Sequence, residues 1–382
     1  MNYRLFSHWL RPIFNSVIQL FNYSVILLIA AACTQKNKLP VQDEAPKPVL
    51  TKQARLVFAG DLMQHRPQVF AARNESGEFD YSESFGYVKN IFQEADIAIL
   101  NFETTLTPYA HYTGYPLFRS PAQLADALQD MGIDVAVMAN NHVCDNGRVG
   151  MEFTMSRLDS LGIAYTGAFI DSIQYQQRHP LLIHANGLRF ALFNYTYDTN
   201  GMPVPAGAIV NLIDSLAIAN DLEKVDRTHI DCVIVFFHWG DEYVRHPNRE
   251  QQKLAALCHR HGAEIVIGSH PHVIQPIDIQ MDADSVIRSV TVYSLGNLVS
   301  NQRNRYRDGG IIVTLDIRKT ENEPVRIEPY YTPVWVLLPK YRILPPAVAD
   351  TLQMPEYQRS AYQRFVEDTR EHLGYERLFR EK

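Results

Sequence analysis

The chain has 382 residues, of which 46% are hydrophobic and 20% are charged, and its formal net charge at pH 7 is −6. These values are ordinary for a globular protein, and the length allows one or two domains with a large core. The negative net charge argues against a nucleic-acid-binding protein, because the neutralisation of phosphates requires a basic surface.

The first 33 residues have the pattern of an export signal. Arg4 and Arg11 precede a short apolar run that ends in Ala31, Ala32 and Cys33. A basic start, an apolar run too short for a comfortable membrane span, and small residues at its end are typical of a signal peptide. Because small residues directly before a cysteine resemble a lipoprotein cleavage site, we expect Cys33 to be lipidated. Plain secretion and a retained anchor are the alternatives.

Residues 34–53 are polar and contain prolines, which is a composition typical of a flexible linker. We therefore expect an exported, membrane-anchored lipoprotein that faces the periplasm or the cell surface. The remaining cysteines, Cys144, Cys232 and Cys258, are odd in number and predict no disulfide framework.

From residue 55 onward, short apolar and β-branched runs recur along the chain, and each ends abruptly in polar residues. Apolar runs that are continuous, rather than alternating with polar residues, are typical of strands buried on both faces. The runs are RLVFAGD, DIAILNFE, DVAVMANNH, RFALFNYTY, DCVIVFFHWG, EIVIGSHPH and SVTVYSLGN.

Helical segments are predicted between several of these strands. Ser120 is the expected N-cap of one helix, Pro121 its first residue and Gly132 its stop. Segments 151–162 and 248–262 also end in glycine. The alternation of strands and helices predicts an α/β fold, in which ligands bind at the carboxyl ends of the strands.

The polar residues at the strand ends form a candidate metal-ligand set. Each alone has an ordinary explanation, such as a turn aspartate or a hydrogen-bonded core histidine. Together their oxygen and nitrogen donors suit catalytic Mn²⁺, Fe²⁺ or Zn²⁺. Two carboxylates and three histidines exceed what one catalytic ion usually takes, so we expect two ions that share one carboxylate. The candidate ligands are Asp61, Glu103, Asn141, His238, His270 and His272.

Two further features bear on this site. Pro271 favours an extended path through GSHPHV, in which His270 and His272 would point to one side of the chain. Several arginines follow the motif strands, either as scattered surface residues or as a rim for an anionic substrate. These arginines are Arg66, Arg119, Arg148, Arg245, Arg303, Arg305 and Arg307.

The motifs at the strand ends are, in order, FAGDLM, NFETTL, MANNHVCDNG, FFHWGDEY, GSHPHV and YSLGN. Their order and spacing, from about residue 55 to about residue 314, resemble the CapA family of bacterial capsule-synthesis proteins, which are linked to poly-γ-glutamate. That family is similar to calcineurin-like metallophosphatases. The resemblance implies a two-sheet β-sandwich flanked by helices, in four layers, with a two-metal centre at the carboxyl ends of the strands. It would occupy residues 54–340 and be followed by a helical extension over residues 341–382.

The resemblance also implies a role for each candidate ligand. Asp61 and His272 would bind the first metal, and Glu103 would bridge the two ions. The second metal would be bound by Asn141, His238 and His270.

The resemblance implies that His142 is the general acid that protonates the leaving group, oriented by Asp145 three residues on. Glu242 would handle a proton or contact the substrate. The metallophosphatases have a histidine two residues after the first aspartate, where this chain has Met63. His65 is a candidate replacement if the loop takes a different path.

These expectations describe a cell-envelope protein of capsule polymer biosynthesis that hydrolyses an amide (γ-glutamyl-like) or related bond with the help of two divalent metal ions. Its partners would be an envelope polymer or peptide substrate, the membrane through its lipid anchor, and capsule-assembly proteins, but not nucleic acid. The alternatives are a non-catalytic lipoprotein subunit of a capsule-assembly complex and a metallophosphoesterase.

Overall fold

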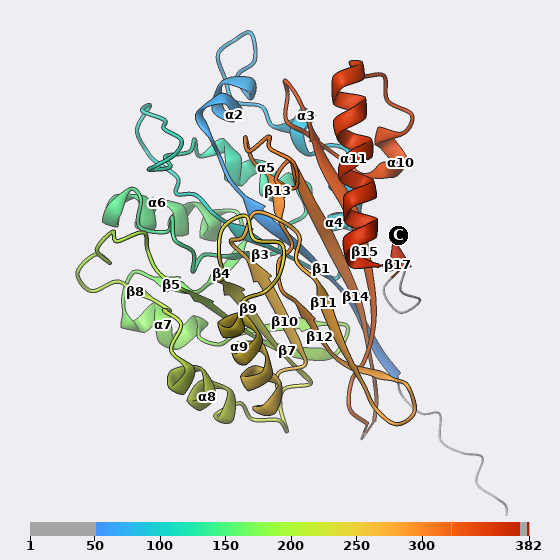
Figure 1. The fold of residues 1–382 in the computed structure, drawn as a ribbon. Coiled ribbons are helices and arrows are strands. Elements are labelled where there is room, and N and C mark those ends of the chain that lie inside the picture. The colour runs from blue at the N-terminus through green and yellow to red at the C-terminus, as the bar shows by residue number, and fades with distance from the viewer. Residues whose placement is uncertain (1–50, 322, 375–379, 382) are drawn as a thin grey trace, which may run out of the picture. The chain divides into compact units, whose positions relative to one another are not determined.

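The computed structural model describes residues 51–321, 323–374 and 380–381 (Figure 1). The expected signal peptide, Cys33 and most of the expected linker lie outside these described residues. The first strand begins at Thr51, so the last residues of the range predicted as a linker belong to a strand. None of the helices in the described ranges combines the length and the apolar character that are needed to cross a bilayer.

The larger of two main sheets surrounds strand β1. Within the described residues it has nine strands, in the order β16-β15-β14-β1-β2-β3-β4, with β13 also paired to β1 and β17 to β15. β1 runs parallel to β2 and β13 and antiparallel to β14. The strands are β1 (Thr51–Leu62), β2 (Ile97–Phe102), β3 (Val135–Val137), β4 (Ala164–Thr166), β13 (Asn297–Val299), β14 (Gly309–Thr320), β15 (Arg326–Leu337), β16 (Arg342–Leu344) and β17 (Arg380–Glu381).

The smaller sheet has the order β11-β12-β10-β9-β7-β6, and its inner strands β7, β9, β10 and β12 are parallel. Its strands are β6 (Leu181–Ala185), β7 (Leu188–Thr196), β9 (Cys232–His238), β10 (Ile265–Ser269), β11 (Ile277–Met281) and β12 (Ile287–Val292). A short separate ribbon pairs β5 (Ala168–Phe169) with β8 (Ile209–Val210).

The two sheets pack face to face, because their strands bury apolar side chains on both faces. Phe58 and Ile99 of the larger sheet share one core with Phe190, Ile234 and Ile267 of the smaller sheet. This shared core explains why the sequence runs are continuously apolar rather than alternating.

Helices cover the outer face of each sheet and complete four layers. Leu128 of α5 and Met155 of α6 share a core with the outer face of the larger sheet. Ile218 of α8 and Leu254 of α9 do the same on the smaller sheet. The predicted α/β fold with a two-sheet sandwich flanked by helices is therefore confirmed. The helices are α2 (Arg66–Ala71), α3 (Ser82–Phe85), α4 (Lys89–Gln93), α5 (Gln123–Met131), α6 (Gly147–Ser160), α7 (Ser172–Arg178), α8 (Ser215–Glu223), α9 (Arg249–Arg260), α10 (Pro346–Ala349) and α11 (Glu356–Leu373).

The segment after residue 340 packs on the same unit, which extends from Leu50 to Lys382. β16 adds a strand to β15, and α11 lies against β15 (Figure 1). Tyr362, Phe365 and Val366 of α11 join the core between the sheets. The range expected to be a helical extension thus contributes a strand as well as helices.

One predicted helix start is wrong. α5 begins at Gln123 rather than at Pro121, and its N-cap position is Ala122. Ser120, the expected N-cap, instead places its hydroxyl 2.7 Å from the Thr104 hydroxyl. The predicted stop is correct, because Gly132 has a left-handed φ of 91°.

Candidate metal centre

The predicted ligands meet where the carboxyl ends of strands from both sheets come together. Asp61 lies at the end of β1, Glu103 directly follows β2, His238 ends β9 and His270 directly follows β10. β1 and β2 are parallel, as are β9 and β10, so each pair delivers its terminal residues to one edge of its sheet. The face-to-face packing of the sheets then brings the two edges together.

The position of Asp61 depends on a close approach between β1 and β13. The Asp61 amide donates a hydrogen bond to the Gly296 carbonyl over 3.0 Å. A Cβ atom on Gly60 would lie only 2.0 Å from that same oxygen, so residue 60 must be glycine in this backbone path. The Asp61 carboxylate accepts a hydrogen bond from Asn101 Nδ2 over 2.8 Å, and its second oxygen lies 2.9 Å from His272 Nδ1.

Glu103 occupies the middle of the site. Its side chain is 0% exposed, and neither carboxylate oxygen has a hydrogen-bond partner. Glu103 Oε1 lies 3.7 Å from His238 Nε2 and 3.8 Å from His272 Nε2. Burial, followed by the nearby Asp61 carboxylate, raises the pKa of Glu103 well above its usual range. A buried carboxylate without a partner is costly, and a bound cation would remove that cost.

The geometry supports metal binding by more than one group of side chains. Among the described residues, three groups place their ligand atoms within 4.8 Å of one another. Glu103 belongs to two of them, which matches the predicted sharing of one carboxylate. The groups are Glu103 with His238 and His270, Asp61 with Glu103 and His272, and Glu242 with His270 and His272.

His238 is oriented so that one nitrogen faces the other candidate ligands. Its Nδ1 lies 3.3 Å from Ser269 Oγ, while its Nε2 lies 3.0 Å from Asn141 Oδ1. Burial and then the neighbouring His270 keep the pKa of His238 well below its usual range. The neutral imidazole that results is the form that binds metals.

His270 is a buried histidine whose Nδ1 has no hydrogen-bond partner. Burial and then His272 lower its pKa to about 3, so its ring is neutral at pH 7. The two oxygens of Glu103 likewise lack hydrogen-bond partners. These buried carboxylate and imidazole atoms are of the types that bind divalent ions, so the residues present fit a metal site.

The extended path predicted for GSHPHV is wrong. His270 has φ 96° and His272 has φ 57°, both in the left-handed region that non-glycine residues rarely adopt. The Tyr243 amide donates to the Pro271 carbonyl over 2.8 Å and holds the loop in place. Such strain costs about 1–3 kcal/mol per residue and is typical of functional sites, where the surrounding structure fixes the conformation.

His142 and Asp145 form the predicted pair. His142 Nδ1 lies 2.7 Å from Asp145 Oδ2, and both side chains are buried. The same carboxylate oxygen accepts a hydrogen bond from the Phe118 amide over 2.7 Å. Asn140 Oδ1 accepts a hydrogen bond from the His142 amide over 3.0 Å, which fixes the backbone of the pair.

The remaining predicted residues differ in their exposure. Glu242 is exposed, and its carboxylate lies close to His270 and His272 at the mouth of the site. Met63, which stands where the metallophosphatases have a histidine, is buried. The His65 ring contacts Gln68 and Asn301 and belongs to none of the ligand groups found among the described residues.

Sequence reasoning assigned no role to several residues that support the ligands. Asn101 Nδ2 donates to Asp61 and lies 3.2 Å from His238 Nδ1, and Asn297 Oδ1 lies 3.1 Å from His272 Nδ1. The Tyr197 ring lies 4.5 Å from the His270 ring, centroid to centroid. All three residues lie in or next to strand-end motifs, and this position is the only feature of the sequence that could have indicated their role.

Comparison with solved structures finds similar chain courses at low identity. The NAD nucleotidase NadN of Haemophilus influenzae is 9% identical with a TM-score of 0.44, and the alignment covers 87% of this chain and 57% of that one. The purple acid phosphatase PPD1 from yellow lupin seeds is 12% identical with a TM-score of 0.28, and 74% of this chain and 54% of that one are covered. At these values nothing about activity follows.

Comparison of sequences finds closer relatives. The PGA biosynthesis protein CapA of Bacillus subtilis is 31% identical over an alignment of 269 residues. This alignment covers 67% of this chain and 66% of that protein, slightly less than two thirds of its length. The capsule biosynthesis protein CapA of Bacillus anthracis is 26% identical over 314 residues, with 75% and 69% covered. Residues 55–302, more than half of the chain, match the family described as bacterial capsule synthesis protein PGA_cap. The chain belongs to this family of bacterial capsule synthesis proteins.

Proposed function

We propose that the protein is a metal-dependent hydrolase of capsule polymer biosynthesis, and that it cleaves an amide bond of the γ-glutamyl type in an envelope polymer. The observation that carries the proposal is Glu103, a fully buried carboxylate that lies between His238 and His272 with both oxygens unpartnered. A merely structural carboxylate at this depth would be hydrogen-bonded or ion-paired.

The residues that would hold the ions are those of the two ligand groups that share Glu103. His238 and His270 belong to one group, and Asp61 and His272 to the other. When bound, divalent ions there would activate water and polarise the scissile carbonyl. Mn²⁺, Fe²⁺ and Zn²⁺ all suit this mixture of carboxylate and imidazole donors.

His142 would supply the proton for the leaving amine. Because its Nδ1 faces Asp145 over 2.7 Å, Nε2 is the nitrogen left to exchange a proton with the substrate. Asp145 would keep the ring in this orientation, a positioning role that its second hydrogen bond, from the Phe118 amide, supports. Glu242, exposed at the mouth, would contact the substrate or accept a proton from it.

The choice of an amide-linked polymer draws on the relatives. One is named for PGA biosynthesis, and a protein of Mycobacterium tuberculosis that is 27% identical over 202 residues is named as a probable polyglutamine synthesis accessory protein. An exported position with a lipid anchor at Cys33 rests on the signal-like pattern of residues 1–33 alone. Capsule-assembly proteins would be its neighbours there.

The test combines metal analysis with activity on two substrates. The full-length chain, purified in detergent, should contain a divalent metal by mass spectrometry and should release fragments from a γ-linked glutamate oligomer. Glu103→Gln should lose both properties, whereas Glu75→Gln, a change at an exposed glutamate, should keep both. A metal-free and inactive protein would favour the non-catalytic subunit, and cleavage of aryl phosphates alone would favour the phosphoesterase.

A further inference from the structure

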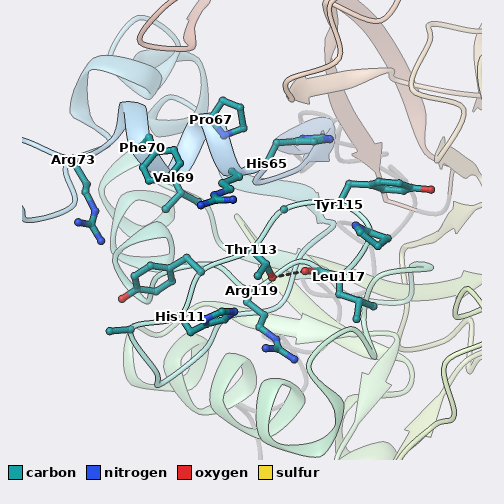
Figure 2. A pocket seen from close by; sticks show the side chains of 15 residues that line it. His65, Pro67, Val69, Phe70, Arg73, His111, Thr113, Tyr115, Leu117 and Arg119 are labelled. Atoms are coloured by element: carbon teal, nitrogen blue, oxygen red, sulfur yellow. Dashed lines mark hydrogen bonds between the residues drawn. The ribbon is translucent and has the colours of Figure 1, made fainter.

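A cavity of about 700 Å³ lies between helix α2 and the loop of residues 110–119 (Figure 2). We refer to it as the arginine cavity. Figure 2 shows Phe70 of α2 and Arg73, two residues beyond the end of α2, on one wall, and His111, Thr113 and Arg119 on the loop wall. Its volume lies in the range of pockets that bind small molecules or polymer segments.

The arginine cavity carries positive charge without matching acids. Arg66, Arg73 and Arg119 line it, and no aspartate or glutamate does. Among the described residues, no carboxylate forms an ion pair with any of the three guanidinium groups. Arg66 and Arg73 lie over the rings of Phe70 and Phe79, 5.3 and 5.1 Å from the ring centroids, and Arg119 Nε is buried without a hydrogen-bond partner. Unpaired guanidinium groups in a concave site attract anions and can hold a carboxylate by two parallel hydrogen bonds.

The walls between the arginines are apolar. Pro67, Val69 and Leu117 line the arginine cavity together with the exposed rings of Phe70 and Tyr115. Such a lining suits a ligand that alternates charged groups with methylene groups, because each part finds a matching surface.

The two walls are held together, so the arginine cavity is formed before any ligand binds. A Cβ atom on Gly114 would lie 2.5 Å from the Arg66 amide nitrogen, which shows how closely the loop approaches the start of α2. Thr113 and Arg119 exchange two backbone hydrogen bonds of 3.1 Å, and the Thr113 hydroxyl donates to the Leu117 carbonyl (Figure 2). A site that is already formed loses less conformational entropy on binding.

The loop wall also reaches the proposed general acid. Phe118, which lies between Leu117 and Arg119, is fully buried, and its ring contacts His65 on one side at 5.1 Å and His142 on the other at 4.5 Å, centroid to centroid. Its amide donates to Asp145, the partner of His142. Since His65 lines the arginine cavity, Phe118 links this cavity to the proposed general acid.

We propose that the arginine cavity is a binding subsite for a polyanionic chain whose carboxylates are joined by amide-linked, partly aliphatic units. Arg66, Arg73 and Arg119 bind successive carboxylates, and the apolar walls contact the methylene groups between them. The subsite holds the part of the polymer on the leaving-group side of the scissile bond. This inference rests on the proposed function for the nature of the polymer, but its binding test is independent of turnover.

The test measures binding to the full-length chain in the presence of a chelator, where no hydrolysis is expected. The probe is a hexamer of γ-linked glutamate, titrated by calorimetry and compared with the uncharged hexamer of γ-linked glutamine. Arg66→Gln/Arg73→Gln changes two exposed side chains, so the fold should survive, and Arg119→Gln tests the partly buried guanidinium. Arg260→Gln, at an exposed arginine of α9, is the matched control.

We expect the double variant and Arg119→Gln each to bind the charged hexamer about tenfold or more weakly, and the control to bind it normally. The wild-type chain should prefer the charged over the uncharged hexamer by at least a similar factor. Equal binding by the double variant, equal binding of the two hexamers, or no binding to the wild-type chain would overturn the inference. Normal binding without any hydrolysis in the presence of metal would count against the proposed function and leave the subsite standing.

Discussion

Replacing Glu103 with glutamine removes an ionisable carboxyl group from the centre of the metal site and preserves the shape of the side chain. In the absence of metal, this change should stabilise the protein. The wild-type carboxylate is 0% exposed and both its oxygens lack partners, so folding removes it from water without compensation. An unsatisfied buried polar group costs about 1–3 kcal/mol, and a charged one costs more. Because glutamine also leaves polar atoms to satisfy, we expect a net gain of about 1–2 kcal/mol.

Bound metal should instead make the wild type more stable than the Glu103→Gln variant. An ion present at about 100 times its dissociation constant stabilises the native state by about 2.7 kcal/mol, and the variant should lose most of that gain with its shared ligand. Urea unfolding followed by fluorescence, in chelator and in excess Mn²⁺, measures both effects. Glu75→Gln, at an exposed glutamate, should behave as the wild type in both conditions.

The pH dependence provides a second measurement of the same effect. Burial and Asp61 raise the pKa of Glu103 above its unfolded value of 4.5. The stability that the protonated group contributes is therefore present below pH 4.5 and is lost as the pH rises through the folded pKa. The metal-free Glu103→Gln variant should not show this decline in stability with rising pH. If Glu103→Gln were less stable than the wild type in chelator, or were stabilised equally by Mn²⁺, the reasoning about the unpartnered carboxylate would be refuted.

Three other changes test separate parts of the structure. His142→Ala should slow hydrolysis of the γ-linked oligomer about 100-fold or more with metal content unchanged, because a positioned general acid contributes that much; parallel loss of metal would contradict a role in proton transfer alone. His270→Gly should reduce stabilisation by Mn²⁺ in thermal melts, because the group of Glu103, His238 and His270 loses a ligand. In chelator His270→Gly should have a higher Tm than His270→Ala, because both lose the buried ring and only glycine accepts the φ of 96° without strain; a lower Tm for the glycine variant would count against strain at this position. Asp231→Asn should destabilise the protein at pH 7. Burial raises the pKa of Asp231, but hydrogen bonds from Lys319 and Arg189 lower it further, so the folded pKa lies below 3.8. The stability that the ionised Asp231 contributes is present above pH 3.8 and is lost as the pH falls through the folded pKa. The difference in free energy of unfolding between variant and wild type, measured in urea, should therefore shrink at pH 3. A difference that stays constant with pH would exclude the ionised carboxylate as its cause.

Much of the site could be predicted because its residues follow strands that are recognisable locally. β9 and β10 are continuous apolar runs, and His238 and His270 stand at or just beyond their ends. Once the runs are read as parallel strands of an α/β fold, the rule that ligands bind at carboxyl ends predicts that these histidines meet. The family resemblance implied the contact between His142 and Asp145, which needs only one turn of chain.

Other features were not predictable, because they depend on contacts between distant segments. Ser120 has the local sequence context of a helix N-cap, but its hydroxyl forms a hydrogen bond with the Thr104 hydroxyl. The two residues are neighbours only in the folded chain. Pro271 favours an extended neighbour, yet the tertiary contacts of GSHPHV hold His270 at a positive φ. The support that Asn101 gives to both Asp61 and His238 requires the packing of the two sheets.

From the amino-acid sequence alone we could infer the class of fold, the strand ends that carry the chemistry and the oxygen and nitrogen donors available there, because these depend on periodicity and on residue type over short stretches. Two features depend on the tertiary structure: Glu103 lies between His238 and His272 without a hydrogen-bond partner, and Arg66, Arg73 and Arg119 line one cavity. Both features arise from segments far apart in the chain, and their energetics depend on burial and on missing partners, which no local pattern records.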